Sequence, residues 1–532
     1  MKKILAETYK KTIVPFLLFT FIFTAYFSSS VGLINSGDTP QYFTTEALIN
    51  NHNLDLRPFE SDPHFFVWPD YFMINDQKLS FRGYMLSILM IPIHLLARYI
   101  SPLFSYKNFA TEVVVPHFKY ELAVGSFFTI LSASGLFFIW KSIVDITKKK
   151  YIAHIIIFIT AFGSYIWKYA AYYSRHGMTV FILGLCTYSF IKMQYHDRWK
   201  HVAKLTFFLC WAISFGIDTI LFISLTVIII SIYGYKLFVR KHILFKKSSL
   251  DMLKIIPPAF SIAVILICVI LNLNAYWYNS IQSNQMPQSS FYFSNVAQKN
   301  RFKVILSAPI FPTLSTVLFN AGKINSVNFQ NFDHLPDSIA RANSLSYAKI
   351  YNFFGLFVIS PILLFSVYAL CFKRNIIENK ALMFTLLMFL LNIIGNAKYY
   401  VFWGGNQYDI RYFYPYSILL AIPLALTIKN AMASTWFIKL SFVFILGSLS
   451  LFSIFMGWLG VINMFKPALT GERRIWMDLY DFRTDYRLYS PTEYINATFM
   501  NRANAWISVI FCILCYATYL LYKISRIKHK AR

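Results

Sequence analysis

Long apolar segments recur along the whole chain and are separated by basic or mixed polar segments. A helix needs roughly 20 predominantly apolar residues to cross the hydrocarbon core of a bilayer, and about twelve segments can be placed on that criterion. The first runs from Thr12 to about Ile34 and the last from Ala503 to Tyr522. The pattern predicts an all-α polytopic membrane protein, a bundle of about 12 transmembrane helices joined by large external loops.

The apolar stretch from Gly83 to Ile100 is one that we do not interpret as a span. It contains His94 and Arg98, and counting it as a span would place the lysine run 148–150 on the outer side of the membrane. We expect instead an amphipathic segment that lies along the outer membrane surface. The region from Ser36 to Lys119 then forms one large external loop.

Lysines at positions 2, 3, 10 and 11 precede the first span and predict a cytoplasmic N-terminus. A cleaved signal peptide is the competing interpretation, but the apolar run is longer than the usual apolar core of such a peptide. The spans divide the chain into a cytoplasmic N-terminus with the first span (1–35), a first external loop with interfacial helices (36–119), a transmembrane core (120–275), a second external loop (276–352), a transmembrane bundle with an external Trp-Gly-Gly loop (353–460), a third external loop (461–502), and a last span with a basic cytoplasmic tail (503–532).

Composition agrees with this class of protein. The chain of 532 residues is 57% hydrophobic and only 14% charged, which excludes a soluble multidomain protein. Its 50 Lys and Arg against 23 Asp and Glu would indicate nucleic-acid binding in a soluble protein, but here the basic excess falls almost entirely on the predicted inner side. The six cysteines lie in apolar stretches, so no disulfide framework is expected, and we interpret the pair Cys512 and Cys515 as packing residues.

The stretch from Ser36 to Leu56 directly follows the first apolar segment. It places Asp38 at the rim of a membrane helix, with Tyr42 and Glu46 following at helical spacing. An acid at such a position is a candidate for chemistry at the membrane surface, although Asp38 could also be a simple helix cap. Further polar and aromatic residues near predicted outer span ends are Arg82, Lys168, Arg175, His176, Asp218, Tyr278, Asn279, Trp403, Asp409 and Arg411.

A carboxylate surrounded by cations suits a reaction in which a general base deprotonates an acceptor while positive groups hold a leaving phosphate. Each candidate also has an ordinary structural role open to it. Arg175 and His176 could be interface residues with their charges directed to water, Asp218 could cap a turn, and Trp403 could belong to an aromatic belt. No cluster of metal ligands stands out, so we assign no cofactor and leave a divalent metal open.

Several stretches, taken in order, resemble one enzyme superfamily. GDTPQYFTTEALINNHNLDL after the first span resembles the opening of the C-type glycosyltransferases (GT-C fold), and is most similar to bacterial relatives of the protein O-mannosyltransferases and aminoarabinose transferases. FFGLFVISPILLFSVYAL (353–370) is similar to a later span of these relatives, and WGGNQYDIRYFYP (403–415) to their tryptophan, double-glycine, arginine-tyrosine segment. YWYNS (276–280) is a weaker match.

The resemblance implies a large first external loop with membrane-lying helices and a donor sugar carried on a polyprenyl phosphate. Asp38 matches the catalytic acid of the family, and Arg411 matches a cation that faces the phosphate or the acceptor. The chain departs from the family at Thr39, where a second acid is common, and at Arg82, where a Lys or His motif is common. Arg175 and His176 stand where the aminoarabinose transferases have another acid.

We therefore expect an integral membrane glycosyltransferase that moves a sugar from a polyprenyl-phosphate donor to a hydroxyl acceptor on a lipid, glycan or protein. Its partners would be the donor, the acceptor and membrane lipids, and no nucleic acid. The expected location is a bacterial cytoplasmic membrane, with both termini inside and the active site outside. Two alternatives stay open: a polysaccharide polymerase or ligase that relies on Arg175 and His176, and a transporter of lipid-linked sugars. Beside the catalytic Asp38, the expected substrate-binding residues are Tyr42, Glu46, Arg82, Arg175, His176, Asp218, Trp403 and Arg411.

Overall fold

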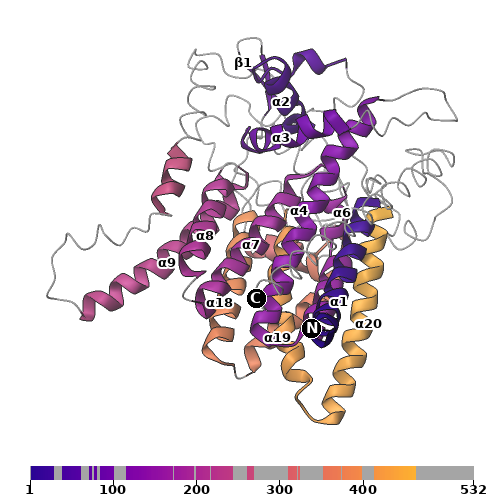
Figure 1. The fold of residues 1–532 in the computed structure, drawn as a ribbon, viewed down its shortest axis with the longest axis vertical. Coiled ribbons are helices and arrows are strands. Elements are labelled where there is room, and N and C mark those ends of the chain that lie inside the picture. The colour runs from indigo at the N-terminus through magenta and orange to yellow at the C-terminus, as the bar shows by residue number, and fades with distance from the viewer. Residues whose placement is uncertain are drawn as a thin grey trace.

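The computed structural model is mostly helical (Figure 1). It describes residues 2–28, 39–61, 71–74, 77–80, 84–100, 116–171, 173–196, 199–215, 217–243, 260–268, 310–319, 321–323, 352–372, 374–397 and 412–462. Three helices in this part of the chain are long and apolar enough to cross a membrane. They are Phe127–Thr147 within α4 (Pro116–Thr147), α18 (Ile376–Ala397), and Lys439–Gly457 within α20 (Trp436–Ile462). A helical membrane protein is therefore the class that the structure supports, and the larger number of spans stays a prediction.

The structure describes further helical elements. They are α1 (Lys2–Ser28), α2 (Thr39–Asn50), α3 (Met85–Ile100), α5 (Lys150–Phe162), α6 (Ile166–Ala170), α7 (Arg175–Tyr195), α8 (Lys200–Phe215), α9 (Thr219–Ile243), α14 (Ile310–Phe319), α17 (Leu356–Ile359) and α19 (Ala421–Ala431), with the 3-10 segments η1 (Arg57–Phe59), η6 (Pro361–Cys371) and η7 (Tyr414–Leu420). Two short antiparallel strand pairs interrupt the all-α pattern. They are β1 (Tyr71–Ile74) with β2 (Gln77–Ser80), and β3 (Ala321–Lys323) with β4 (Asn352–Phe354).

The apolar run 151–172, which the sequence pattern predicts as one span, is broken into α5 and α6. The break falls at Gly163, where an added Cβ would lie only 2.6 Å from the Ile159 carbonyl oxygen and 3.1 Å from Ser453 Cβ in α20. The hydroxyl of Ser360 donates a hydrogen bond of 2.6 Å to the Gly163 carbonyl. Contacts from distant segments thus hold the break between α5 and α6, which the continuous apolar sequence does not predict.

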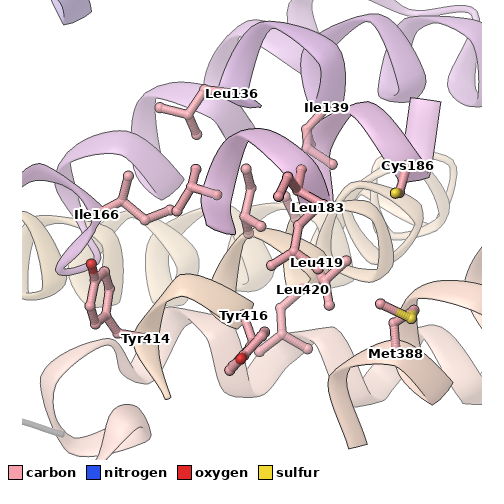
Figure 2. Close-up of a cluster of buried hydrophobic side chains, with 14 of the residues drawn as sticks. Leu136, Ile139, Ile166, Leu183, Cys186, Met388, Tyr414, Tyr416, Leu419 and Leu420 are labelled. Carbon is pink, nitrogen blue, oxygen red and sulfur yellow. The ribbon is translucent and has the colours of Figure 1, made fainter. Parts of the chain in front are cut away.

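The helices enclose a large apolar core. Figure 2 shows a part of it in which Leu136 and Ile139 of α4, Leu183 of α7, Met388 of α18 and Leu419 of η7 converge. α4 and α7 approach most closely at two glycines, since a Cβ on Gly184 would lie 2.4 Å from the Gly135 carbonyl oxygen. Small residues that let backbones touch are a common way of joining helices in membranes.

α2 and α3 lie together at one end of the bundle, and the N-terminus of α1 lies toward the opposite end (Figure 1). α3 lies across that end, whereas α4 runs along the bundle. α2 and α3 are joined by hydrogen bonds from Ser87 Oγ to the Gln41 carbonyl (2.8 Å) and from Thr45 Oγ1 to the Ser87 carbonyl (3.2 Å). Another face of α3 is apolar and exposed at Leu95 and Leu96. We call this end of the molecule the α2–α3 end.

Candidate functional site

A buried ionic cluster joins α2 to α3. Glu46 is only 7% exposed, and its Oε1 lies 2.7 Å from His94 Nδ1. Its Oε2 accepts hydrogen bonds from Arg98 Nη2 and, at 3.4 Å, from Asn50 Nδ2. Because an ionised carboxylate can only accept, His94 Nδ1 is the donor of its pair. Both carboxylate oxygens of Glu46 are therefore engaged within the protein.

His94 is fully buried. Burial lowers the pKa of His94 from its ordinary value, and the positive charge of Arg98 acts in the same direction, whereas Glu46 opposes both. With a pKa below the usual range, the imidazole is neutral at neutral pH, and the hydrogen bond to Glu46 fixes its tautomer. The ring also packs against the ring of Tyr42, with 4.8 Å between the centroids.

Tyr42 connects this cluster to the rest of the bundle. Its ring lies 5.8 Å from that of Tyr173, in an edge-on arrangement. The Tyr173 ring in turn lies 4.8 Å from Phe128 in α4. Tyr173 directly precedes Ser174, which caps α7 by accepting a hydrogen bond of 3.3 Å from the His176 amide. α2 thus contacts the point where α7 begins.

Cations and aromatic rings gather around the start of α7. The Arg175 guanidinium lies 5.7 Å above the Tyr412 ring, and the His176 ring lies edge-on to Tyr169 at 5.5 Å. Tyr169 stacks on Tyr414 with 4.0 Å between centroids. The ammonium group of the fully buried Lys168 lies 5.3 Å from the centre of the Tyr169 ring. Positive charges beside a helix N-terminus favour an anionic ligand.

Asp218 lies between the helices α8 and α9. Its Oδ1 accepts a hydrogen bond of 3.0 Å from the Leu221 amide, so the interpretation of Asp218 as a cap is confirmed. Its Oδ2 accepts a bond of 2.9 Å from the Tyr416 hydroxyl and one of 3.5 Å from Thr179 Oγ1 in α7. This carboxylate therefore also ties α7 and η7 to the start of α9.

Five of the nine predicted site residues lie in the described part of the chain: Tyr42, Glu46, Arg175, His176 and Asp218. The other four, Asp38, Arg82, Trp403 and Arg411, lie outside it. Two of these four are direct neighbours in sequence of described residues, since Asp38 precedes Thr39 at the start of α2 and Arg411 precedes Tyr412.

His94 and Arg98 contact Glu46 but are not among the site residues predicted from the sequence. Their spacing was a usable signal, because Glu46 and Asn50 are four residues apart on one helix, and His94 and Arg98 are four residues apart on another. Residues so spaced share one helix face. Tyr173 had no comparable signal, since aromatic residues are frequent throughout the chain.

Among the described residues no group of three or more His, Cys, Asp or Glu side chains could hold a metal ion. The cysteines at 186, 210 and 371 are free thiols. Comparison of the chain with models of known protein families, with curated proteins and with solved structures found no match.

Proposed function

We propose that the chain is an integral membrane glycosyltransferase with a C-type fold of about 12 spans. It would transfer a sugar from a polyprenyl-phosphate donor to a hydroxyl acceptor on a lipid, glycan or protein. The supporting observation is the contact between the Tyr42 and Tyr173 rings, 5.8 Å apart. It joins α2, which begins directly after Asp38, to Tyr173, which stands two residues before Arg175.

In the proposed reaction Asp38 removes the proton of the acceptor hydroxyl. The acceptor oxygen then attacks the anomeric carbon, the bond from that carbon to the phosphate oxygen breaks, and polyprenyl phosphate leaves with the bonding electrons. A single displacement of this kind inverts the anomeric configuration. Negative charge grows on the leaving phosphate, and Arg411 and Arg175 are the groups that we assign to stabilise it. Arg82 is a further candidate for the phosphate, and Trp403 would shape the sugar site with Tyr42.

The orientation that this function needs places the α2–α3 end on the outer side of a bacterial cytoplasmic membrane. Donor and acceptor would reach the site from the outer leaflet. The exposed apolar face of α3, which includes Leu95 and Leu96, supports this arrangement, because such a face favours contact with lipid.

The decisive experiment compares the wild-type protein with Asp38→Asn. The purified protein in lipid nanodiscs is incubated with a panel of polyprenyl-phosphate-linked hexoses and pentoses labelled in the sugar, together with an extract of membrane acceptors. Asparagine can form the same helix-cap hydrogen bonds as aspartate but cannot act as a base, so turnover is expected to fall by about 100-fold or more. Glu60→Gln is the matched control, because Glu60 is an exposed acid of the same loop, paired with Lys78. Nearly intact turnover in the Asp38→Asn protein would overturn the role of this acid.

A polysaccharide polymerase or ligase is the second candidate function. Arg175 and His176 support it, since both stand at the start of α7 against the rings of Tyr412 and Tyr169. This candidate predicts that Arg175→Gln and His176→Gln abolish the joining of lipid-linked glycan chains, whereas Asp38→Asn leaves it intact. The same set of variants therefore separates the two functions.

A further inference from the structure

We propose that Glu46, Asn50, His94 and Arg98 form a clamp that fixes α2 on α3 in one register, and that His94 and Glu46 act as positioning residues for the reaction. The second half of this inference rests on the proposed function. In this proposal the four side chains act through the helix that carries Tyr42. Glu46, expected from the sequence to bind substrate, instead has both carboxylate oxygens engaged within the protein.

The clamp consists of two pairs of polar side chains with the same spacing, one pair on each helix. Glu46 and Asn50 are one turn apart on α2, and His94 and Arg98 are one turn apart on α3. Glu46 pairs with both His94 and Arg98, and Arg98 Nη1 also donates a hydrogen bond of 2.8 Å to Asn50 Oδ1. A shift of either helix by one residue would rotate these side chains away from one another.

Apolar packing alone does not determine how α2 sits on α3 at a membrane surface. Lipid chains are as apolar as leucine, so an apolar helix face gains little by leaving lipid for protein. Buried charged and hydrogen-bonded groups are different, because leaving one of them without its partner is unfavourable. The clamp therefore selects the register in which α2 docks on α3. Selecting one arrangement in this way is the best-attested role of buried polar groups in other proteins.

The clamp reaches the candidate site through Tyr42. The His94 ring packs on the Tyr42 ring at 4.8 Å, and Tyr42 lies one helical turn before Glu46. The same Tyr42 ring contacts Tyr173 at the start of α7. If the clamp opens, the first turn of α2 loses its fixed position relative to Arg175 and His176, and a small displacement of a reacting group is enough to slow catalysis strongly.

Two substitutions at His94 separate positioning from proton transfer. In His94→Asn the side-chain amide stands close to where Nδ1 stood, so it can donate to Glu46, but it cannot take up a proton. In His94→Leu both abilities are lost. Positioning predicts that the asparagine variant works and the leucine variant fails, whereas proton transfer through His94 predicts that both fail.

The clamp itself is tested by thiol labelling, which needs no substrate. Thr45→Cys is introduced after the six native cysteines are replaced, because Thr45 is fully buried against α3. A membrane-impermeant maleimide should label this thiol slowly in the parent protein and in the His94→Asn protein. In the His94→Leu, Glu46→Gln and Arg98→Gln proteins labelling should be roughly tenfold faster or more, because local opening exposes the thiol.

The transfer assay then tests positioning, with the amount of protein in the membrane as the control for folding. Turnover should fall on the order of 100-fold in the His94→Leu protein and stay near the parent value in the His94→Asn protein. Unchanged labelling in all three opening variants would overturn the clamp, whatever the reaction is. Faster labelling with unchanged turnover would overturn the positioning role, and a parent protein without transfer activity would overturn the proposed function while the labelling result stands.

Discussion

Asp55, in the loop after α2, organises the backbone around it. Its Oδ1 accepts hydrogen bonds from the amides of Arg57 (3.1 Å) and Lys78 (3.0 Å), and its Oδ2 accepts one of 2.8 Å from Arg57 Nε. Burial by itself would raise the pKa of Asp55, but the hydrogen bonds from Arg57 and Lys78 outweigh it and hold the pKa below its ordinary value of 3.8. The ionised carboxylate therefore stabilises the loop above about pH 4, and this contribution is lost as the pH falls through the pKa of the folded state.

Replacing this carboxylate should loosen the loop in a pH-dependent way. For Asp55→Asn we expect a loss of about 1–3 kcal/mol of local stability at pH 7, because hydrogen bonds between charged partners are removed. Hydrogen exchange of the amides of Arg57 and Lys78 measures it. The wild-type and variant proteins should differ at pH 7, and the difference should shrink as the pH falls through the lowered pKa of Asp55. Equal exchange at pH 7 would contradict the assignment.

Whether a residue's contact could be predicted from the sequence depends on how far away in the chain its partner lies. The cap formed by Asp218 could be predicted, because the residue stands directly before a helix and bonds to Leu221 within its first turn. The bond from Tyr416 to the same carboxylate could not, since the two residues are 198 positions apart. Glu46 was placed correctly one turn after Tyr42, but its partner His94 comes from another helix of the loop.

The contact between α4 and α7 gives a prediction about helix packing. An added Cβ at Gly184 would lie 2.4 Å from the Gly135 carbonyl oxygen, and one at Gly135 would lie 2.6 Å from the Val180 carbonyl oxygen. Gly184→Ala must therefore push two helix backbones apart, which typically costs about 1–3 kcal/mol. The thermal midpoint of the purified protein should fall, together with its accumulation in the membrane.

Gly447→Ala in α20 is the matched control for this prediction. A Cβ at Gly447 would meet nothing within 4 Å, and alanine is a better helix former than glycine by about 0.5–1 kcal/mol. The control should thus melt at the same temperature as the wild-type protein or slightly higher. If both alanine variants melt alike, the close approach of α4 and α7 is wrong.

Long helices could be predicted from the sequence better than the breaks between them. The apolar sequence predicts spans at about 381–397 and 436–460, and α18 (Ile376–Ala397) and α20 (Trp436–Ile462) follow them to within a few residues. The run 151–172 is equally apolar but bends at Gly163, because Ser360 holds the carbonyl of that glycine and α20 packs against the bend. Similarly, the run 353–370 begins with the strand β4 and continues as α17 and η6. Tertiary contacts override apolar periodicity at these positions.

Cations pair with carboxylates and lie against tyrosine rings at both ends of the molecule. At the α2–α3 end, cations lie against tyrosine rings, as with Lys168 and Arg175. Near the end of α4 that is remote from α3, Lys192 pairs with Asp145 at 2.9 Å. The lysines 148–150 follow on the exposed turn between α4 and α5. The lysine run is thus separated from α3 along the bundle, which is the arrangement that a cytoplasmic lysine run and an outer first loop would require.

Which end faces outward is open to direct measurement. In a background without native cysteines, Glu60→Cys marks the loop after α2 and Lys149→Cys marks the turn after α4, and both positions are exposed. In intact cells, a membrane-impermeant maleimide should label the cysteine at position 60, and the cysteine at position 149 should react only after the cells are opened. The expectation follows from the lysine run, because basic loops are retained on the cytoplasmic side. The reverse labelling pattern would place the α2–α3 end inside, and a transferase that draws its donor from the outer leaflet could not then use this site.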